Sequence, residues 1–297
     1  MNQAFSLLHQ GFVQDALKAA LLVAVLSSFL GVFVVLKRIV FVGAALAEVS
    51  ALGAALAFFP PVAGFLLPLA ARFGATTPEA YEHSVPIVMA FLFMLLAVAF
   101  FSQQGLGRHL PREAIIGGAF AGASGLTALV LSTNASGSEH AADALNGNIL
   151  GVLPLDITLL AIAGAVVAVV QILFFKEFVL VSFDPEVART LGYRSSRWEL
   201  LWYLTLGVMI AISIHVAGTV LVFAYLVLPP VTALMISRRM SMVLLLSVLF
   251  GAIATFAGVL ISVSPANLPM SPTIVACSVA ILLLAWAAKS VAGLRKA

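Results

Sequence analysis

Apolar stretches, each long enough to cross a bilayer, follow one another along almost the whole chain and are separated by short polar segments. A helix needs about 20 apolar residues to cross the hydrocarbon core, so this pattern is typical of a protein with many transmembrane helices. It predicts nine spans, with approximate bounds 16–36, 43–70, 86–102, 114–132, 155–175, 199–213, 215–236, 241–262 and 272–290. The stretch from Glu199 to Ile236 is short for two complete crossings, and Gly218 inside it suits a break or a re-entrant turn. Eight spans is therefore an alternative to nine.

The composition agrees with a membrane protein and excludes a water-soluble globular domain. Hydrophobic residues make up 63% of the 297 residues and charged residues only 9%, whereas soluble domains carry about 25% charged residues. The basic residues behind the net charge of +3 lie at the ends of apolar stretches, so we expect a lipid environment and no nucleic-acid partner. We predict an all-α, polytopic membrane protein with eight or nine transmembrane helices, forming a single transmembrane domain over residues 1–297.

The distribution of Lys and Arg predicts the orientation of the chain. If the N-terminus lies outside, thirteen of the fifteen Lys and Arg residues fall on the inner side, and only Lys18 and Arg72 fall on the outer side. Cytoplasmic loops carry an excess of Lys and Arg in membrane proteins. We therefore expect a multi-pass protein of the cell inner (plasma) membrane, with the N-terminus outside and the C-terminus in the cytoplasm.

The longest polar segment on the predicted inner side runs from Lys176 to Glu199. Asp184, Pro185 and Glu186 form a good helix start, because Asp caps free backbone N–H groups, Pro fits the first turn and Glu complements the helix dipole. Gly192 is suited to ending that helix. The pattern predicts a short amphipathic helix in the cytoplasm, which is either an interfacial connector or a docking helix for a cytoplasmic partner.

Sequence motifs of bond-making chemistry are missing from the chain. It contains no G-x-x-x-x-G-K-[ST] phosphate loop, no H-E-x-x-H motif and no Rossmann glycine pattern. We expect this chain to be no enzyme and to bind no cofactor, so the energy for any transport must come from a partner or from an ion gradient.

Four segments of the chain, in order, resemble the membrane subunits of the ABC-type zinc/manganese/iron permease family. They are LGVFVVLKRIVFVGAALAEVSALGAALAF at 30–58, GNIL at 147–150, SFDPEVARTLGYRSSRWELL at 182–201 and HVAGTVLVFAYLVLPPVTALMISRR at 215–239. The resemblance implies a fold like that of the vitamin B12/metal-chelate type importer permeases. It also implies a homodimer with a translocation path between the two copies.

The same resemblance implies partners for this chain. Two cytoplasmic ABC ATPase subunits would hydrolyse ATP, and an extracytoplasmic binding protein would deliver the substrate. The coupling segment, about 176–198, would receive the movement of the ATPase. Its candidate contact residues are Phe183, Asp184, Pro185, Glu186, Ala188, Arg189 and Gly192.

Glu48 is the candidate residue of the translocation path, because a carboxylate inside a span is costly and tends to be functional. The metal permeases carry G-D-A-L-S-H at this place, where Asp and His can both ligate a cation. Here the stretch is Gly43–Ala44–Ala45–Leu46–Ala47–Glu48, so Ala44 replaces the Asp and Glu48 replaces the His. Glu48 therefore has three interpretations: a residue of the path or its gate, a hydrogen-bonded packing residue, or a metal ligand.

Two further places hold candidate residues. His215 follows the sixth predicted span and is a second path or metal candidate, although a lone His is more often an interface residue. Glu139, His140 and Asp143 lie in a predicted outer loop, where they would form an outer site for cations, a docking surface for the binding protein, or simply a solvated loop.

Together these features predict the membrane-spanning permease subunit of an ATP-driven ABC importer for a divalent metal ion (zinc, manganese or iron) or a metal chelate. The alternatives are an ABC importer of a non-metal substrate, an ion-coupled secondary transporter and an intramembrane enzyme. A secondary transporter usually shows internal repeats and charged residues near the midplane. No repeat is evident in this sequence.

Overall fold

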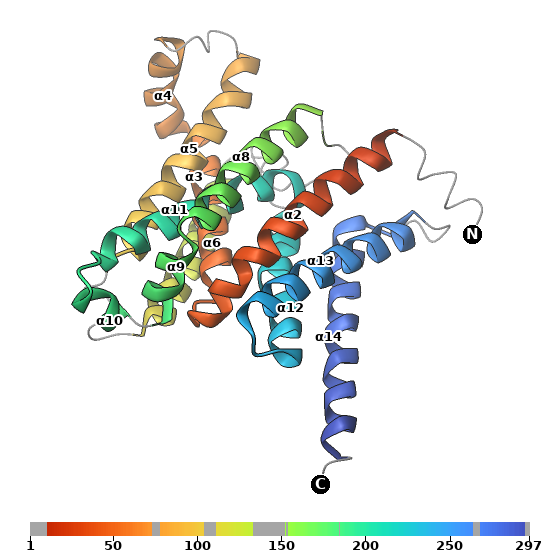
Figure 1. The fold of residues 1–297 in the computed structure, drawn as a ribbon. Coiled ribbons are helices and arrows are strands. Elements are labelled where there is room, and N and C mark those ends of the chain that lie inside the picture. The colour runs from red at the N-terminus through yellow and green to blue at the C-terminus, as the bar shows by residue number, and fades with distance from the viewer. Residues whose placement is uncertain are drawn as a thin grey trace. The chain divides into compact units, whose positions relative to one another are not determined.

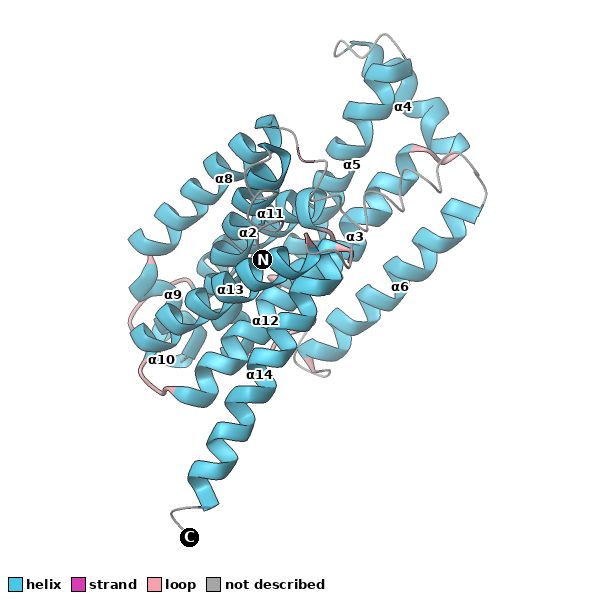
Figure 2. Cartoon of the chain, turned by 90° about the vertical axis from the view of Figure 1, so that its right-hand side faces the viewer, coloured by secondary structure: helices cyan, strands magenta, loops and turns pink. Residues whose placement is uncertain are grey.

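The computed structural model describes residues 11–72, 78–103, 111–132, 152, 154–183, 185–263 and 268–294. All regular elements within these ranges are helices (Figures 1 and 2). They are α2 (Gly11–Leu36), α3 (Val42–Ala57), α4 (Pro60–Arg72), α5 (Pro78–Phe101), α6 (Arg112–Ser132), α8 (Pro154–Leu173), α9 (Phe175–Phe183), α10 (Pro185–Thr190), α11 (Ser195–Ala217), α12 (Thr219–Ile236), α13 (Met240–Ser262) and α14 (Met270–Leu294).

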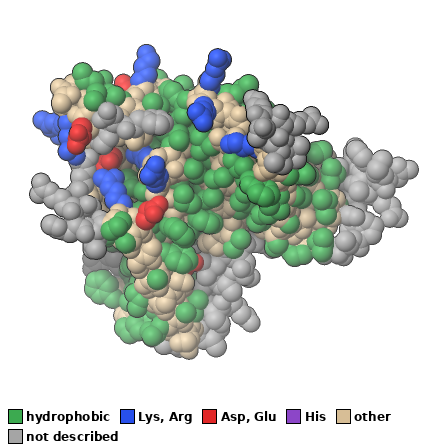
Figure 3. Space-filling model, turned by 90° about the horizontal axis from the view of Figure 1, so that it is seen from below, with side chains coloured by type: hydrophobic (Ala, Val, Ile, Leu, Met, Phe, Trp, Pro, Cys, Tyr) green, Lys and Arg blue, Asp and Glu red, His purple; other side chains and the backbone are tan. Residues whose placement is uncertain are grey.

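Eight of the helices in the described ranges are long and apolar enough to cross a membrane, and α3 with α4 would make a ninth span if the pair is counted as one. Large apolar side chains such as Phe65 and Leu284 are more than two-thirds exposed, and hydrophobic side chains cover much of the face shown in Figure 3. Such a surface would promote association in water, whereas it is the ordinary surface of a protein in lipid. The predicted all-α, polytopic fold with eight or nine spans is confirmed.

The predicted span 43–70 is bent in the structure. Helix α3 ends at Ala57, α4 begins at Pro60, and the two helices are inclined by 74°. Phe58 and Phe59 donate their backbone N–H groups to Ala55 and Leu56, which tightens the last turn of α3. A proline disfavours the helical conformation of the residue before it, so Pro60 ends the helix at this place.

The region from Ser195 to Ile236 forms two complete helices rather than two short ones. Helix α11 begins at Ser195, four residues before the predicted start, and continues to Ala217. Gly218 has φ of 81°, a conformation that glycine adopts without steric cost, and it separates α11 from α12. The ambiguity between eight and nine spans thus lies at the bend after α3, not at Gly218.

The chain divides into two compact units. The first unit comprises the described residues within Met1–Val40, Gly147–Phe175 and Ile212–Ala297, and it contains α2, α8, α12, α13 and α14. The second unit comprises those within Phe41–Asn146 and Lys176–Ala211, and it contains α3 to α6, α10 and most of α9 and α11.

In the first unit, α2 packs against α8, α12 and α13, and α14 packs against α12 and α13. Two glycines allow these helices to approach closely. A Cβ atom added to Gly31 would overlap the backbone of Leu226, and one added to Gly258 would lie 2.6 Å from Ile274 Cα. Small residues of this kind allow close helix packing in membranes, where helices gain little from the hydrophobic effect.

Hydroxyl groups also connect the helices of the first unit. Ser247 Oγ donates to the Ser28 carbonyl oxygen at 2.8 Å, and Thr255 Oγ1 donates to the Gly251 carbonyl oxygen at 2.8 Å. The Tyr225 hydroxyl is hydrogen-bonded to Thr255 Oγ1. All these side chains are buried, so the helix carbonyls provide hydrogen-bond partners that lipid cannot provide.

In the second unit, α3 packs against α5 and α6. Ser50 Oγ on α3 donates to the Ala90 carbonyl oxygen on α5 at 3.3 Å. Helix α5 also approaches α11 closely, since a Cβ atom added to Gly207 would lie 2.9 Å from Val98 Cγ2. These contacts hold α3, and with it Glu48, against its neighbours.

Candidate functional site

Glu48 is the seventh residue of α3, about 9 Å along the helix axis from its start. Its side chain is half-buried and forms a hydrogen bond with the Ser124 side chain on α6. The neighbouring Ala45 and Ala47 are buried and small, so α6 can approach α3 closely here. The arrangement presents a carboxylate that is held by a hydroxyl from a second helix.

Thr127 extends this polar face of α6. It lies one helical turn beyond Ser124 and is 4% exposed, and its buried Oγ1 atom has no hydrogen-bond partner among the residues that the structure describes. Ser124 and Thr127 were not among the site residues predicted from the sequence. The signal that points to them is a pair of small hydroxyl residues at i and i+3 inside an apolar span, because such residues share one helix face.

The described residues do not form a complete metal site around Glu48. Among them, no group of three or more His, Cys, Asp and Glu side chains could hold a metal ion. Ala44, one turn earlier on α3, contributes no ligand atom. Glu48 can therefore supply one or two carboxylate oxygens, and the remaining ligands of a bound cation would come from water, from backbone carbonyls or from another chain.

Helix α10 forms the predicted short helix of the coupling segment. It runs from Pro185 to Thr190, and Gly192 follows with φ of 84°. The N–H groups of Gly192 and Tyr193 donate to the carbonyl oxygens of Arg189 and Ala188, both at 3.0 Å. These bonds satisfy the helix end as the sequence predicted, with glycine in the left-handed conformation that ends many helices.

The exposed and buried faces of α10 are distinct. Ala188 is fully buried, so it anchors the helix. Val187 and Leu191 are 43% and 63% exposed, and Glu186 and Arg189 are exposed as well. An apolar pair at i and i+4 with charged residues beside it is a surface on which a partner can dock. Asp184 and the side chains of Phe183 and Pro185 lie outside the described residues.

Aromatic side chains connect α9 and the residues after α10 to the start of α11. The Trp198 ring on α11 lies 6.0 Å from the Phe178 ring on α9, at 85°, and 6.4 Å from the Tyr193 ring, at 58°. The Phe178–Trp198 pair is edge-to-face, an arrangement that is favourable at this distance, and the Tyr193–Trp198 pair is tilted. The coupling segment is thus tied to the start of α11.

An ion pair joins α6 to α11 close to this segment. Arg112 Nη1 lies 3.3 Å from Glu199 Oε1, and Arg112 also forms a side-chain hydrogen bond with Tyr203. The Glu199 side chain is 6% exposed and that of Arg112 is 39% exposed. The sequence predicts only an inner-side charge at Arg112 and a span boundary at Glu199, and it does not predict that the two residues pair.

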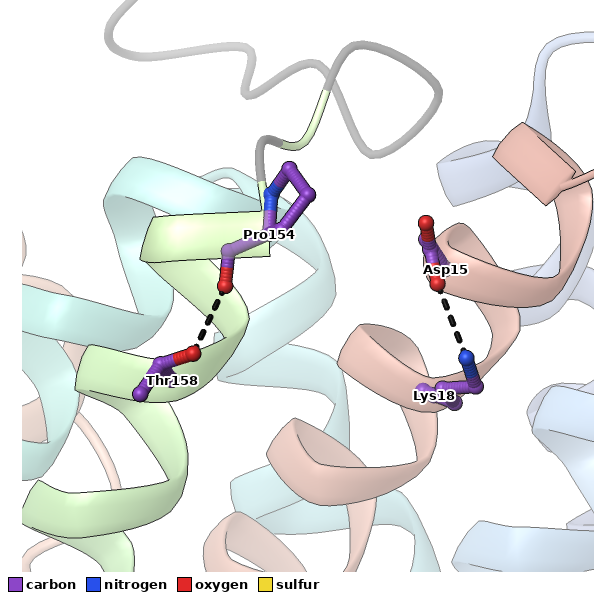
Figure 4. A network of polar contacts seen from close by, with 4 residues as sticks. All are labelled: Asp15, Lys18, Pro154 and Thr158. Atoms are coloured by element: carbon purple, nitrogen blue, oxygen red, sulfur yellow. Dashed lines mark hydrogen bonds and ion pairs between the residues drawn. The ribbon is translucent and has the colours of Figure 1, made fainter.

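The remaining candidates are not tested by the structure. The backbone of His215 lies in α11, but its side chain is outside the described residues, as are Glu139, His140 and Asp143. At the start of α2, Lys18 Nζ pairs with Asp15 Oδ1 at 2.9 Å, and in α8 Thr158 Oγ1 donates to the Pro154 carbonyl oxygen (Figure 4). The ion pair joins a Lys expected outside to an Asp on the same helix, so it neutralises charge locally.

The helical fold and the apolar surface together define a polytopic membrane protein. The chain belongs to the ABC 3 transport family, whose model matches residues 9–289. It is a multi-pass membrane protein and the permease subunit of an ABC importer, as the motifs predicted, and the secondary-transporter alternative is not supported.

Relatives and solved structures agree with this assignment. The chain is 28% identical over 275 residues to the manganese import system permease protein ScaB of Streptococcus gordonii, covering 93% of this chain and 90% of that protein. It superposes on PsaBC from Streptococcus pneumoniae in complex with Fab with a TM-score of 0.76, at 24% identity, covering 96% of this chain and 95% of the other. A metal-chelate type ABC transporter in an inward-facing conformation gives a TM-score of 0.68, at 17% identity, with coverages of 92% and 84%. These two structures confirm the fold.

Proposed function

We propose that this chain imports a divalent metal ion or a metal chelate, with Glu48 in the translocation path. The observation that carries this function is the Glu48 carboxylate, half-buried on α3 and bonded to Ser124 on α6. Such a group is expensive in a transmembrane helix and attracts a cation. The relative ScaB, named for manganese import, supports a metal substrate.

The ligand chemistry at Glu48 favours manganese over zinc as the substrate. Carboxylate and water oxygens suit manganese, whereas imidazole suits zinc, iron and copper. Glu48 supplies oxygen where the metal permeases have an imidazole, and Ala44 supplies no ligand at all. The site would thus be built of oxygen ligands. In a homodimer, each copy would contribute one Glu48 to a shared path.

The energy comes from partner chains in this proposal. Two ABC ATPase subunits hydrolyse ATP and dock on the exposed face of α10, where Val187, Leu191 and Arg189 are accessible. An extracytoplasmic binding protein delivers the substrate on the opposite side, and this chain binds no cofactor of its own. The N-terminus lies outside and the C-terminus in the cytoplasm of a plasma membrane, in agreement with the distribution of Lys and Arg.

Uptake by the reconstituted complex tests the proposal. The permease is placed in proteoliposomes with its ATPase and binding protein, and uptake of radiolabelled manganese, iron and zinc is measured with and without ATP. We expect manganese or iron uptake that needs ATP and is blocked by vanadate. Glu48→Gln lowers it by at least about tenfold, which corresponds to roughly 1.4 kcal/mol of lost cation binding.

A matched variant controls for loss of a carboxylate in general. Glu113→Gln neutralises an exposed carboxylate in the first turn of α6 and should leave uptake unchanged. Unchanged uptake of every cation with Glu48→Gln removes Glu48 from the path. Uptake that continues without ATP and is abolished by a protonophore supports the ion-coupled alternative instead.

A further inference from the structure

Two parts of the second unit carry the proposed function: the coupling segment around α10, and Glu48 on α3. A transport cycle requires that movement of the coupling segment alters the surroundings of Glu48. The described contacts within this unit form a continuous connection between them, and that connection passes through α6.

The connection begins where α10 ends. Tyr193 follows the glycine that ends α10, and its ring contacts Trp198, which also contacts Phe178 on α9. Glu199 is the next residue after Trp198 on α11. The Tyr193 backbone N–H donates to the Ala188 carbonyl oxygen of α10, and the Tyr193 ring contacts Trp198, so α10 is linked to the first turn of α11.

The second contact of the connection is the Arg112–Glu199 ion pair, at 3.3 Å. Arg112 is the first residue of α6 and also bonds Tyr203, one turn further along α11. Phe101 and Ile116 line the recess beside Arg112 and Tyr203. Glu199 is buried, and the positive guanidinium group of Arg112 offsets part of the cost of burying its negative charge.

The third part of the connection is α6 itself. It is uninterrupted from Arg112 to Ser132 and contains no proline (Figure 2). A helix inside hydrocarbon cannot unwind without leaving backbone groups unpaired, so α6 moves as a rod. Ser124 lies about 18 Å along this rod from Arg112, and its side chain is hydrogen-bonded to Glu48.

We propose that Arg112 and Glu199 are positioning residues that transmit movement of the coupling segment, through α6 and Ser124, to the carboxylate of Glu48. This inference rests on the proposed ATP-driven import. An apolar contact between α6 and α11 would give comparable stability at lower desolvation cost. An ion pair with a defined geometry instead offers two discrete arrangements, made and broken, which is what a switching contact requires.

The test is the number of manganese ions imported per ATP hydrolysed, measured on the whole complex in proteoliposomes. Arg112→Gln and Glu199→Gln each lower this ratio by about tenfold, within the usual range of coupling between sites, while ATP hydrolysis continues. The double variant lowers it no further than either single variant, because both residues act through one contact. Arg112→Lys restores part of the ratio, since it keeps the charge.

Two controls separate coupling from stability. Asp15→Asn breaks the exposed ion pair with Lys18, and Glu113→Gln removes the charge next to Arg112; both should keep the wild-type ratio. Tyr203→Phe removes only a hydroxyl and lowers the ratio less than Glu199→Gln does, which keeps the proposal testable if a charge variant fails to fold.

The outcomes distinguish this inference from the function on which it rests. If Arg112→Gln and Tyr203→Phe lower the melting temperature and leave the ions imported per ATP unchanged, the pair is structural and the inference is overturned. If the wild-type complex imports no metal on addition of ATP, the proposed function itself is overturned, and the inference with it.

Discussion

In the first unit, buried hydroxyls of Ser247, Thr255 and Tyr225 bond to helix carbonyls and to one another. The second unit, by contrast, contains two carboxylates. The buried Glu199 pairs with Arg112, and the half-buried Glu48 is hydrogen-bonded to the Ser124 hydroxyl. A hydroxyl on a helix satisfies its bond locally and adds no charge. A carboxylate at the same depth costs several kcal/mol unless it is paired.

This difference indicates that the two units have different tasks. The first unit is held by close helix contacts at Gly31 and Gly258, which favour one fixed arrangement. The second unit contains the costly charges and also the exposed helix α10. Buried charges are costly and tend to be functional, so we expect variants of the first unit to change stability and variants of the second to change transport.

The largest expected effect is on the packing of the first unit. Gly31→Ala places a Cβ atom against the Leu226 backbone, which cannot move aside as a flexible side chain could. We expect the free energy of unfolding to fall by about 3 kcal/mol. Thermal unfolding in detergent, followed by size-exclusion chromatography, measures this.

Gly122→Ala on α6 is the matched control, because a Cβ atom there meets nothing within 4 Å. It should leave the stability unchanged or raise it by up to about 1 kcal/mol, since alanine favours helix. Equal losses in the two variants would contradict the close contact at Gly31.

The next effect concerns the docking face of α10. Leu191 is 63% exposed, and Leu191→Asp should weaken association with the ATPase by about 2 kcal/mol, or about 30-fold. The stability of the permease alone should change by less than about 0.5 kcal/mol. Co-purification and a binding titration with the ATPase measure the effect, with Leu191→Met as the conservative control. Normal ATPase binding by Leu191→Asp would place the docking surface elsewhere.

A smaller effect is expected for Tyr225→Phe in the first unit. It removes one buried hydrogen bond, while Thr255 keeps its bond to the Gly251 carbonyl. Stability should fall by about 1 kcal/mol, and manganese imported per ATP should stay at the wild-type value. A lowered transport ratio at full stability would show that the first unit also takes part in coupling.

The smallest effect is predicted for Asp15→Asn. The Asp15–Lys18 pair is exposed at the start of α2, so its loss should change the stability by no more than about 0.5 kcal/mol, at any salt concentration. A larger loss measured by thermal unfolding would indicate that the pair is less solvated than its exposure implies.

Much of the helical arrangement could be predicted because its signals are local. Apolar length located the spans to within several residues, and Gly192 predicted the end of α10 correctly. Helix α11 begins four residues before its predicted start, because Ser195–Trp198 is helical although it lacks the apolar pattern of a span. The bend after Ala57 was also missed, although Pro60 and Pro61 are its local cause.

The candidate site could be predicted only in part. Glu48 stands out as a carboxylate in an apolar span, whatever surrounds it. Its partner Ser124 and the pairing of Arg112 with Glu199 have no such signal, because each joins residues from helices far apart in the chain. The position of Ala188 as a buried anchor, with Val187 and Leu191 exposed, likewise depends on how α10 packs.

The sequence by itself determined that this protein spans a membrane many times, that it carries a short capped helix between spans, and that one span contains a carboxylate. These properties follow from the transfer energy of consecutive residues and from the conformational preferences of Pro and Gly. Only the tertiary structure decided that Glu199 meets Arg112 and that Glu48 meets Ser124. Contacts of this kind depend on the relative rotation and depth of packed helices, which result from the fit of many side chains at once.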